Sequence, residues 1–482
     1  MGATHTGTAS TLYRNPLNAQ ITIPGNIEYD YDYCMTVGAG GIYATASDVA
    51  NFGSAFFGGN DVLLSQESLD EMATRWNDEG EDTDIYEDGY GLGWDYVESL
   101  AYEEAGVTVL GKGGDISRQH AFLLVAPEQA ISVAVLSSGG GSNYNELVAE
   151  AILTAALETQ GISVEPLTAP EVELVDEIPS EYSAYEGMYV LSDYYGPQLC
   201  YFSFDDQEMH VQHYDFAGFR TDDYRYTADG GFVSVDEEGV PTTDQTILYF
   251  DETENGVYIR ADAFSETPGL GSGIVRQYVA ERISPYDVSE SALSSWSEYS
   301  GREIVIYNSR YSSTDYDRPF GVGYMLEDLP GYIYLLSQQG GKPIRIVDET
   351  HAAAFTTCPS STNRDMMDAE IGDIILSDGS VIDGLSLTNG WRFRFVDELP
   401  VFDSSVNEVA LYDSEAQWFV IGDDVAGSTI SVDRPEESAI YVYNKYHEVV
   451  YSTHMIGASD EIPLPSGGYI MFIGQTGDCI EL

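Results

Sequence analysis

Lys112 is the residue whose type and surroundings most suggest chemistry. It stands between glycines in the stretch VLGKGGDISRQHAFLLVAPE, at the start of an apolar run. The chain has three lysines in 482 residues, against 81 acidic side chains. A cation on a strand can bind a carboxylate, and small neighbours let the backbone of a ligand approach the strand. The segment is therefore the leading candidate for a binding or catalytic site.

Other patterns that could carry chemistry are weaker. His210 and His213 in HVQH are three residues apart in a predicted strand, so they face opposite sides and are not expected to share a metal. The acidic loop from Asp78 to Asp88 lacks the glycine and glutamate of a calcium-binding EF-hand loop and is predicted to be a solvated charge run. Neither a G-x-S-x-G elbow nor an H-E-x-x-H motif occurs. No metal and no cofactor are therefore expected.

Residues 1 to 160 are predicted to form the mixed α/β unit that positions Lys112. Thr45 followed by Asp48 indicates one helix start, and Ser65 a second. Asn143 is expected to cap a third helix, which would cover a sheet with an apolar stripe of Leu147, Val148, Ala151, Ile152 and Ala155. The expected antiparallel strands of that sheet are YGLGWDYV, TVLGKGG, HAFLLVAP and ISVAVLSS.

The rest of the chain is predicted to be all-β. Alternating, aromatic-rich segments are separated by Gly, Asp and Asn turns, which is typical of barrels or sandwiches. Gly187 and Gly301 lie in similar segments 114 residues apart, and Arg276 and Arg394 lie 118 apart, so the first two modules are interpreted as a repeat. The predicted divisions are a linker at 161–180, modules at 181–285 and 286–400, and a small C-terminal module at 401–482.

Composition limits the partners of this protein. The net charge of −62 leaves no basic surface for nucleic acid or an anionic membrane, and no segment is apolar enough to span a lipid bilayer. The four cysteines, at positions 34, 200, 358 and 479, lack metal-ligand spacing. Such acidity fits a salt-loving host or a secreted protein. We favour the secreted protein, located outside the cell or on its surface, although no signal peptide is visible.

Several segments of the first unit resemble one enzyme family. GAGGIYATASDVANFG, YGLGW and GKGGDISRQHAFLLVAPEQAISVAVLSSGG follow the order and spacing seen in the serine β-lactamase and penicillin-binding-protein-like hydrolases, which include class C β-lactamases. The opening MGATHTG is also similar. The resemblance covers residues 1 to 160, the C-terminal half of a family domain. It implies a partial β-lactamase-like α/β domain, with an antiparallel sheet and helices, followed by all-β modules.

The resemblance implies roles for four consecutive residues. Lys112, Gly113 and Gly114 occupy the family's third motif, where the lysine binds a substrate carboxylate and the small residues let the substrate pair with the strand. The backbone amide of Asp115 would be an oxyanion-hole donor. The Asp115 side chain is unexpected there, because its charge would lie where an anion must be stabilised. The alternative is that Lys112 is a solvated strand residue.

The nucleophile motif of the family is missing. In S-x-x-K the lysine one helical turn away activates the serine, yet Val109, Gln339 and Val442 stand three residues before the three lysines. The match to the Y-x-N motif at Tyr13 comes after the segment it should precede. We therefore expect a start site inside a longer gene, and an inactive chain.

Two functions follow as hypotheses. The first is a truncated serine hydrolase whose intact form acts through an acyl-enzyme on an amide or ester, such as a cell-wall peptide or another small acyl substrate. The second is a non-catalytic extracellular protein whose β modules bind a cell-surface polymer.

Overall fold

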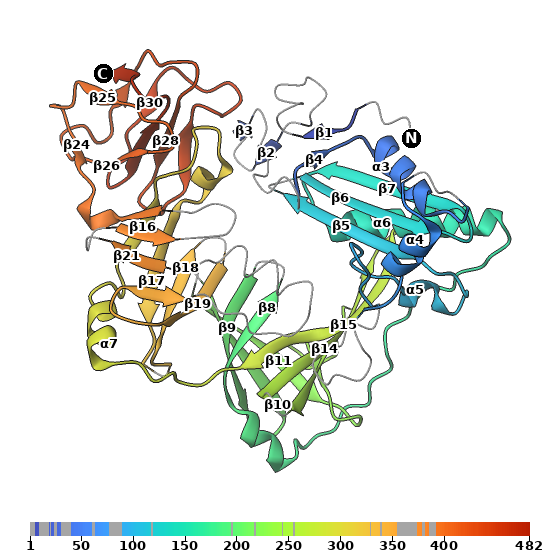
Figure 1. The fold of residues 1–482 in the computed structure, drawn as a ribbon. Coiled ribbons are helices and arrows are strands. Elements are labelled where there is room, and N and C mark those ends of the chain that lie inside the picture. Colours follow the sequence, from blue (N-terminus) through green and yellow to red (C-terminus); the bar gives the residue numbers. More distant parts are fainter. Residues whose placement is uncertain are drawn as a thin grey trace.

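One α/β unit and three β-rich units follow one another along the chain, and Figure 1 shows them arranged in an arc. The computed structural model describes residues 5–8, 19, 21–23, 27–29, 40–59, 63–76, 89–116, 119–193, 196–215, 218–242, 244–253, 256–327, 329–337, 340–353, 374–377, 381–384 and 392–482. The predicted fold class, a β-lactamase-like α/β part followed by barrel-like and sandwich-like β modules, is confirmed.

The first unit is built on a three-stranded antiparallel sheet in the order β5-β6-β7. Its strands are β5 (Leu110–Ile116), β6 (Gln119–Ala126) and β7 (Ile131–Ser138). Residues on β6 alternate between the two faces, and both faces are buried. The helices are α3 (Ala46–Gly53), α4 (Gln66–Met72), α5 (Leu100–Glu103) and α6 (Ser142–Thr159).

Two helices cover the two faces of this sheet. Ala149, Leu153 and Leu157 of α6 recur every four residues and pack on Phe122 and Leu124 of β6. On the opposite face, Leu123 and Val125 of β6 pack against Ala55 and Phe56, in the 3₁₀ turn Ser54–Phe56 that follows α3. Gly53 lets the chain approach β7, because a Cβ there would lie 2.1 Å from the Ser132 hydroxyl.

The predicted starts of the first two helices are confirmed. Thr45 accepts a hydrogen bond from the Asp48 amide (3.2 Å), and Ser65 accepts one from the Ser68 amide (3.3 Å). The Asp48 carboxylate accepts a hydrogen bond from the His5 amide (2.9 Å). It thereby ties the N-terminal segment to α3.

Three other predictions for this unit are wrong. YGLGWDYV forms bridges between Gly91 and Trp94 and between Tyr96 and Gly111, not a regular strand. The residue at the N-cap of α6 is Gly141 instead of Asn143. The buried stripe of α6 is Asn145, Ala149, Leu153 and Leu157, whereas Ile152 from the predicted stripe is 49% exposed.

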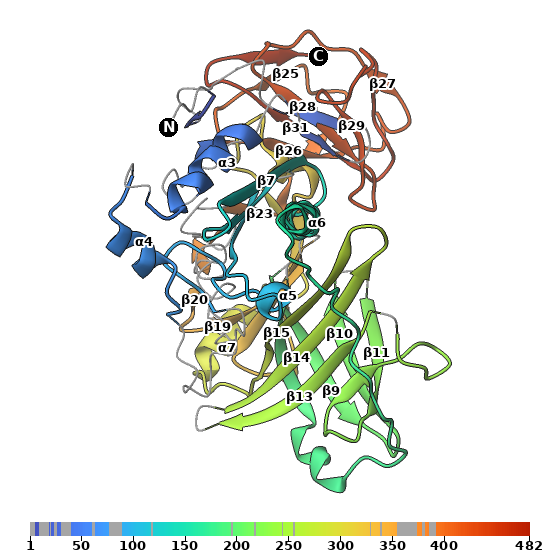
Figure 2. The ribbon, with the colours of Figure 1, turned by 90° about the vertical axis from the view of Figure 1, so that its right-hand side faces the viewer.

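The second unit is an eight-stranded antiparallel barrel that β15 closes by pairing with β8. Its interior is filled by aromatic rings, including Phe202, Phe232 and Phe250, and Tyr182 packs against them. The strands are β8 (Gly187–Asp193), β9 (Gly196–Phe204), β10 (Glu208–Asp215), β11 (Gly218–Tyr226), β12 (Phe232–Ser234), β13 (Thr246–Thr253), β14 (Gly256–Thr267) and β15 (Gly271–Arg282). Figure 2 shows the long β14–β15 hairpin reaching towards α6.

The third unit is a second eight-stranded barrel, closed by β16 and β23. Trp296 of α7 (Glu290–Ser297) is fully buried against it. The strands are β16 (Glu303–Ile306), β17 (Phe320–Met325), β18 (Tyr332–Ser337), β19 (Gly340–Ile346), β20 (His351–Ala353), β21 (Ile374–Ser377), β22 (Val381–Gly384) and β23 (Arg392–Phe395). The predicted domain boundaries and the duplication remain predictions.

The last unit is centred on a five-stranded sheet in the order β24-β26-β31-β28-β29. One face packs on Tyr316 and Phe320 of the second barrel unit, and the other packs beneath two small sheets, β25-β32 and β27-β30. The strands are β24 (Val401–Phe402), β25 (Glu408–Ala410), β26 (Gln417–Ile421), β27 (Thr429–Ile430), β28 (Ala439–Tyr443), β29 (Val449–Ser452), β30 (Ile462–Pro463), β31 (Tyr469–Ile473) and β32 (Cys479–Glu481).

The remaining elements are short. They are the paired strands β1 (Gly7–Thr8) with β4 (Ile42–Tyr43) and β2 (Ile21–Ile23) with β3 (Ile27–Tyr29), and the 3₁₀ turns Ser180–Tyr185, Thr314–Asp317 and Val396–Glu398.

Candidate functional site

The four predicted site residues lie next to one another on β5, at the edge of the three-stranded sheet. Side chains alternate along a strand, so Lys112 and Gly114 face the side of α3, whereas Gly113 and Asp115 face the side of α6. The pairs Lys112 with Leu123 and Gly113 with Phe122 agree with this assignment, because Leu123 packs towards α3 and Phe122 towards α6.

The Lys112 ammonium group is paired with Asp95. Its Nζ lies 2.9 Å from Asp95 Oδ1, and the lysine side chain is 46% exposed. Asp95 Oδ2 accepts a hydrogen bond from the Gly113 amide at 2.6 Å. The Asp95 carboxylate therefore pairs with the Lys112 ammonium group and also accepts a hydrogen bond from the Gly113 amide at the edge of β5.

Two glycines of β5 have different surroundings. A Cβ on Gly111 would lie 2.1 Å from the Tyr96 ring, so only glycine allows that ring to cover the strand. A Cβ on Gly114 would meet no atom of the described residues within 4 Å. Among the described residues, the space beside Lys112 on the same face of the strand is therefore open.

The Asp115 side chain is turned away from Lys112, onto the α6 side of the sheet. It accepts hydrogen bonds from the Ser142 amide (3.0 Å) and hydroxyl (2.5 Å), and it contacts Nδ1 of buried His120. The start of a helix favours a negative charge, so α6 stabilises this carboxylate. The expectation that its charge lies in the anion site is wrong, because Lys112 and Asp115 are an odd number of residues apart.

The Asp115 amide faces the open edge of β5. The Gly111 amide donates to the Tyr96 carbonyl (3.0 Å) and the Gly113 amide donates to Asp95, so both point away from β6. Amides alternate in direction along an antiparallel strand, so the amide of Asp115 points the same way. The strand thus presents a cation, open space and outward backbone donors in one place.

Sequence reasoning missed three residues of this arrangement: Asp95, His120 and Ser142. The alternation along β5 and β6 contained the signal for His120, which is paired with Asp115 across the two strands. No sequence signal indicated Asp95, because its contacts depend on how the irregular segment before β5 returns to the strand.

Side chains that could bind a metal ion lie elsewhere in the described part of the chain. Asp205, Glu208 and His210 on the first barrel form the one group of three such side chains found there. His213 is buried and lies 3.0 Å from Asp222, so it does not join His210, as predicted. The acidic run from Asp78 to Asp88 lies outside the described residues.

The chain thus begins with an α/β unit that carries the β5 site and continues with β-rich units. Residues 3–157 match the family described as Beta-lactamase. This match supports the resemblance to the β-lactamase and penicillin-binding-protein-like family that the sequence predicted for residues 1 to 160.

Solved structures give a weaker comparison. They include SurE crystallised with D-Leu (TM-score 0.32, 16% identity, 51% of this chain and 52% of that chain). They also include an octameric penicillin-binding protein homologue from Pyrococcus abyssi (TM-score 0.29, 18% identity, 58% and 57%). The chain spans about half the length of these structures, and such TM-scores support no functional argument. No curated protein matches.

A membrane-spanning helix needs both sufficient length and sufficient hydropathy. None of the described helices is both long enough and apolar enough to cross a lipid bilayer.

Proposed function

We propose that residues 1 to 160 supply the substrate-binding edge of a serine hydrolase that forms an acyl-enzyme. The substrate is an amide or ester with a free carboxylate, such as a cell-wall peptide. In this reaction a serine hydroxyl attacks the acyl carbonyl, the leaving group departs with a proton, and water then releases the acid. The arrangement of Lys112, the open space at Gly114 and the outward amide of Asp115 on one edge strand carries the proposal.

Asp95 occupies the contacts that a substrate carboxylate would use. It neutralises Lys112 and accepts from the Gly113 amide. A substrate must therefore displace Asp95 from at least one of these groups. Exposed ion pairs are weak, about 0 to 1 kcal/mol, so this displacement costs little.

The 482 residues themselves are proposed to be inactive, because they contain no S-x-x-K. A fluorescent penicillin and a fluorophosphonate probe should leave the purified chain unlabelled. A serine β-lactamase labelled in parallel shows that the probes work. Stoichiometric labelling of this chain would overturn the proposal.

The second candidate is a non-catalytic protein outside the cell or on its surface, whose β modules hold a surface polymer. The net charge of −62 favours an exposed, highly soluble protein.

The DNA immediately upstream distinguishes the two candidates. An in-frame S-x-x-K codon pattern preceded by a signal sequence supports the hydrolase. An in-frame stop codon supports the binding protein.

A further inference from the structure

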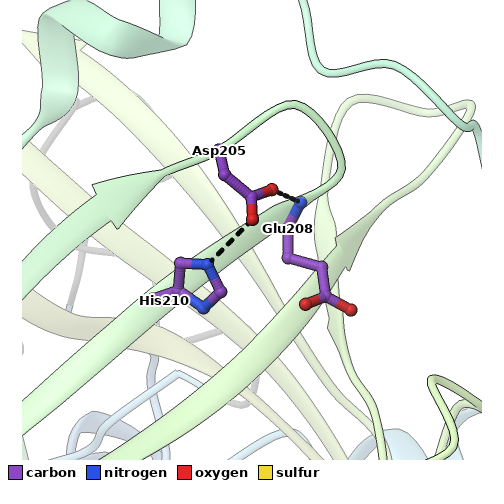
Figure 3. Close-up of side chains that lie close together, drawn as sticks. All are labelled: Asp205, Glu208 and His210. Atoms are coloured by element: carbon purple, nitrogen blue, oxygen red, sulfur yellow. Dashed lines mark hydrogen bonds and ion pairs between the residues drawn. The ribbon is translucent and has the colours of Figure 1, made fainter.

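The turn between β9 and β10 holds a carboxylate in a defined orientation. One oxygen of Asp205, Oδ1, accepts hydrogen bonds from the backbone amides of Gln207 and Glu208, both at 2.8 Å. These contacts fix the carboxylate, and its second oxygen, Oδ2, faces the imidazole of His210 (Figure 3).

His210 is oriented by a residue from another strand. Its Nδ1 lies 2.7 Å from Oδ1 of Asp223, the residue opposite it on β11. A carboxylate on one ring nitrogen fixes the tautomer and leaves the other nitrogen as the electron-pair donor. Histidines that bind metals are commonly held in this way.

The remaining ring nitrogen is at a spacing suited to a shared metal. His210 Nε2 lies 3.4 Å from Asp205 Oδ2, which is long for a hydrogen bond between charged groups. Two ligands on a tetrahedral ion with bonds of about 2.1 Å lie about 3.4 Å apart. The Glu208 carboxylate adds a third ligand atom, and all three atoms lie within 4.8 Å of one another.

We propose that Asp205, Glu208 and His210 bind one divalent transition-metal ion, with Zn²⁺ preferred and water completing the coordination. Asp223 acts as the residue that positions His210. The imidazole ligand selects zinc over calcium and magnesium, which prefer sites built of oxygen. The acidic protein supplies a favourable potential for any cation, and the histidine supplies the selectivity.

The location indicates a structural role for the ion. The Ile178 amide at the end of the linker lies 3.4 Å from the carbonyl of Asp206 in the same turn. Through His210 and Asp223 the ion would also connect the turn to β11. Metal binding should therefore raise the thermal stability of the first barrel, because the ion binds the folded form.

The test uses the full chain after removal of metal with a chelator. Isothermal titration with ZnCl₂, in excess MgCl₂ and high salt to suppress binding by scattered carboxylates, should show one zinc site per chain. Cobalt(II) should give the strong visible absorption of a tetrahedral complex. His210→Ala and Asp205→Asn should abolish the site, and Asp223→Asn should weaken it about 10- to 100-fold.

Asp236→Asn is the matched control. Asp236 also accepts two backbone amides in a turn, from Glu238 (3.0 Å) and Val240 (2.9 Å), but it belongs to no metal-ligand group among the described residues. This variant should bind zinc as the parent does. Circular dichroism checks that each variant is folded. Absence of a zinc site in the parent, or equal zinc binding by folded His210→Ala, would overturn the proposal.

Discussion

The carboxylate of Asp115, on an edge strand, accepts both the amide and the hydroxyl of Ser142 at the start of α6. Through this pair the strand that carries Lys112 is fixed to the helix behind it. The Asp115 carboxylate therefore has a structural role, because it holds β5 to α6. Its backbone amide still points to the open edge of β5.

Replacing Asp115 by alanine should destabilise the first unit by about 1–3 kcal/mol, because the Ser142 amide and His120 lose their acceptor. Hydrogen exchange of the α6 amides, followed by mass spectrometry, measures the effect. Asn143→Ala is the control, since Asn143 is exposed and its carboxamide accepts only from the next residue in the described contacts. Equal effects of the two variants would contradict this account.

Replacing Asp95 by alanine should speed hydrogen exchange at the Gly113 amide, which loses its acceptor. Lys112→Ala should have less effect on this exchange, because it removes only a half-exposed ion pair. Glu98→Ala, which removes an exposed partner of Arg75, is a control for lost negative charge. Unchanged exchange at Gly113 in Asp95→Ala would show that this contact is absent in solution.

The two apolar faces of α6 should respond differently to truncation. Leu153 is fully buried against the sheet, so Leu153→Ala should cost about 2–5 kcal/mol. Ile152 is 49% exposed, so Ile152→Ala should change stability by less than about 0.5 kcal/mol. Thermal and urea unfolding of the two variants, compared with the parent, provide the measurement. The reverse order would favour the stripe predicted from the sequence.

His447 should make stability depend on pH. Burial lowers the pKa of its imidazole below the usual 6.5, although nearby Glu303 opposes this effect, and the ring stacks on Phe320 at 4.0 Å. The folded state keeps the ring neutral while the unfolded chain binds a proton, so stability should fall as pH drops below 6.5. In His447→Asn this part of the fall should disappear.

Asparagine suits the test at position 447 because the backbone there has φ of 65°, which asparagine tolerates better than most residues. Melting temperatures of both proteins from about pH 8 to about pH 5 give the comparison. Ionisable groups that do not contact residue 447 contribute equally to both curves. Parallel curves would show that His447 does not contribute.

Local patterns predicted the strands around Lys112 well, because β6 and β7 are rich in apolar residues between turn residues and β5 directly precedes them. They predicted the helix α6 but not its buried face, because apolar residues occur on more than one face and the buried stripe includes the polar Asn145. Periodicity cannot choose between two apolar faces without knowledge of the partner surface.

The candidate site was predictable along β5 but not across it. Lys112, Gly113, Gly114 and Asp115 are consecutive, so the strand alone positions them. Asp95 comes from an irregular segment, and His210, one of the proposed zinc ligands, is oriented by Asp223 on a different strand. Contacts of this kind depend on strand register and loop path, which residue type and spacing do not specify.

The second barrel and the C-terminal sheet share one buried core, so truncation between them should destabilise both. Trp418 donates to the Ile306 carbonyl (2.9 Å) and Tyr443 to the Tyr316 carbonyl (2.5 Å), within one buried cluster. A fragment ending near residue 400 would expose Tyr316 and Phe320 to water. The last two units should therefore be expressed together and should melt in one cooperative transition, as a single folding unit.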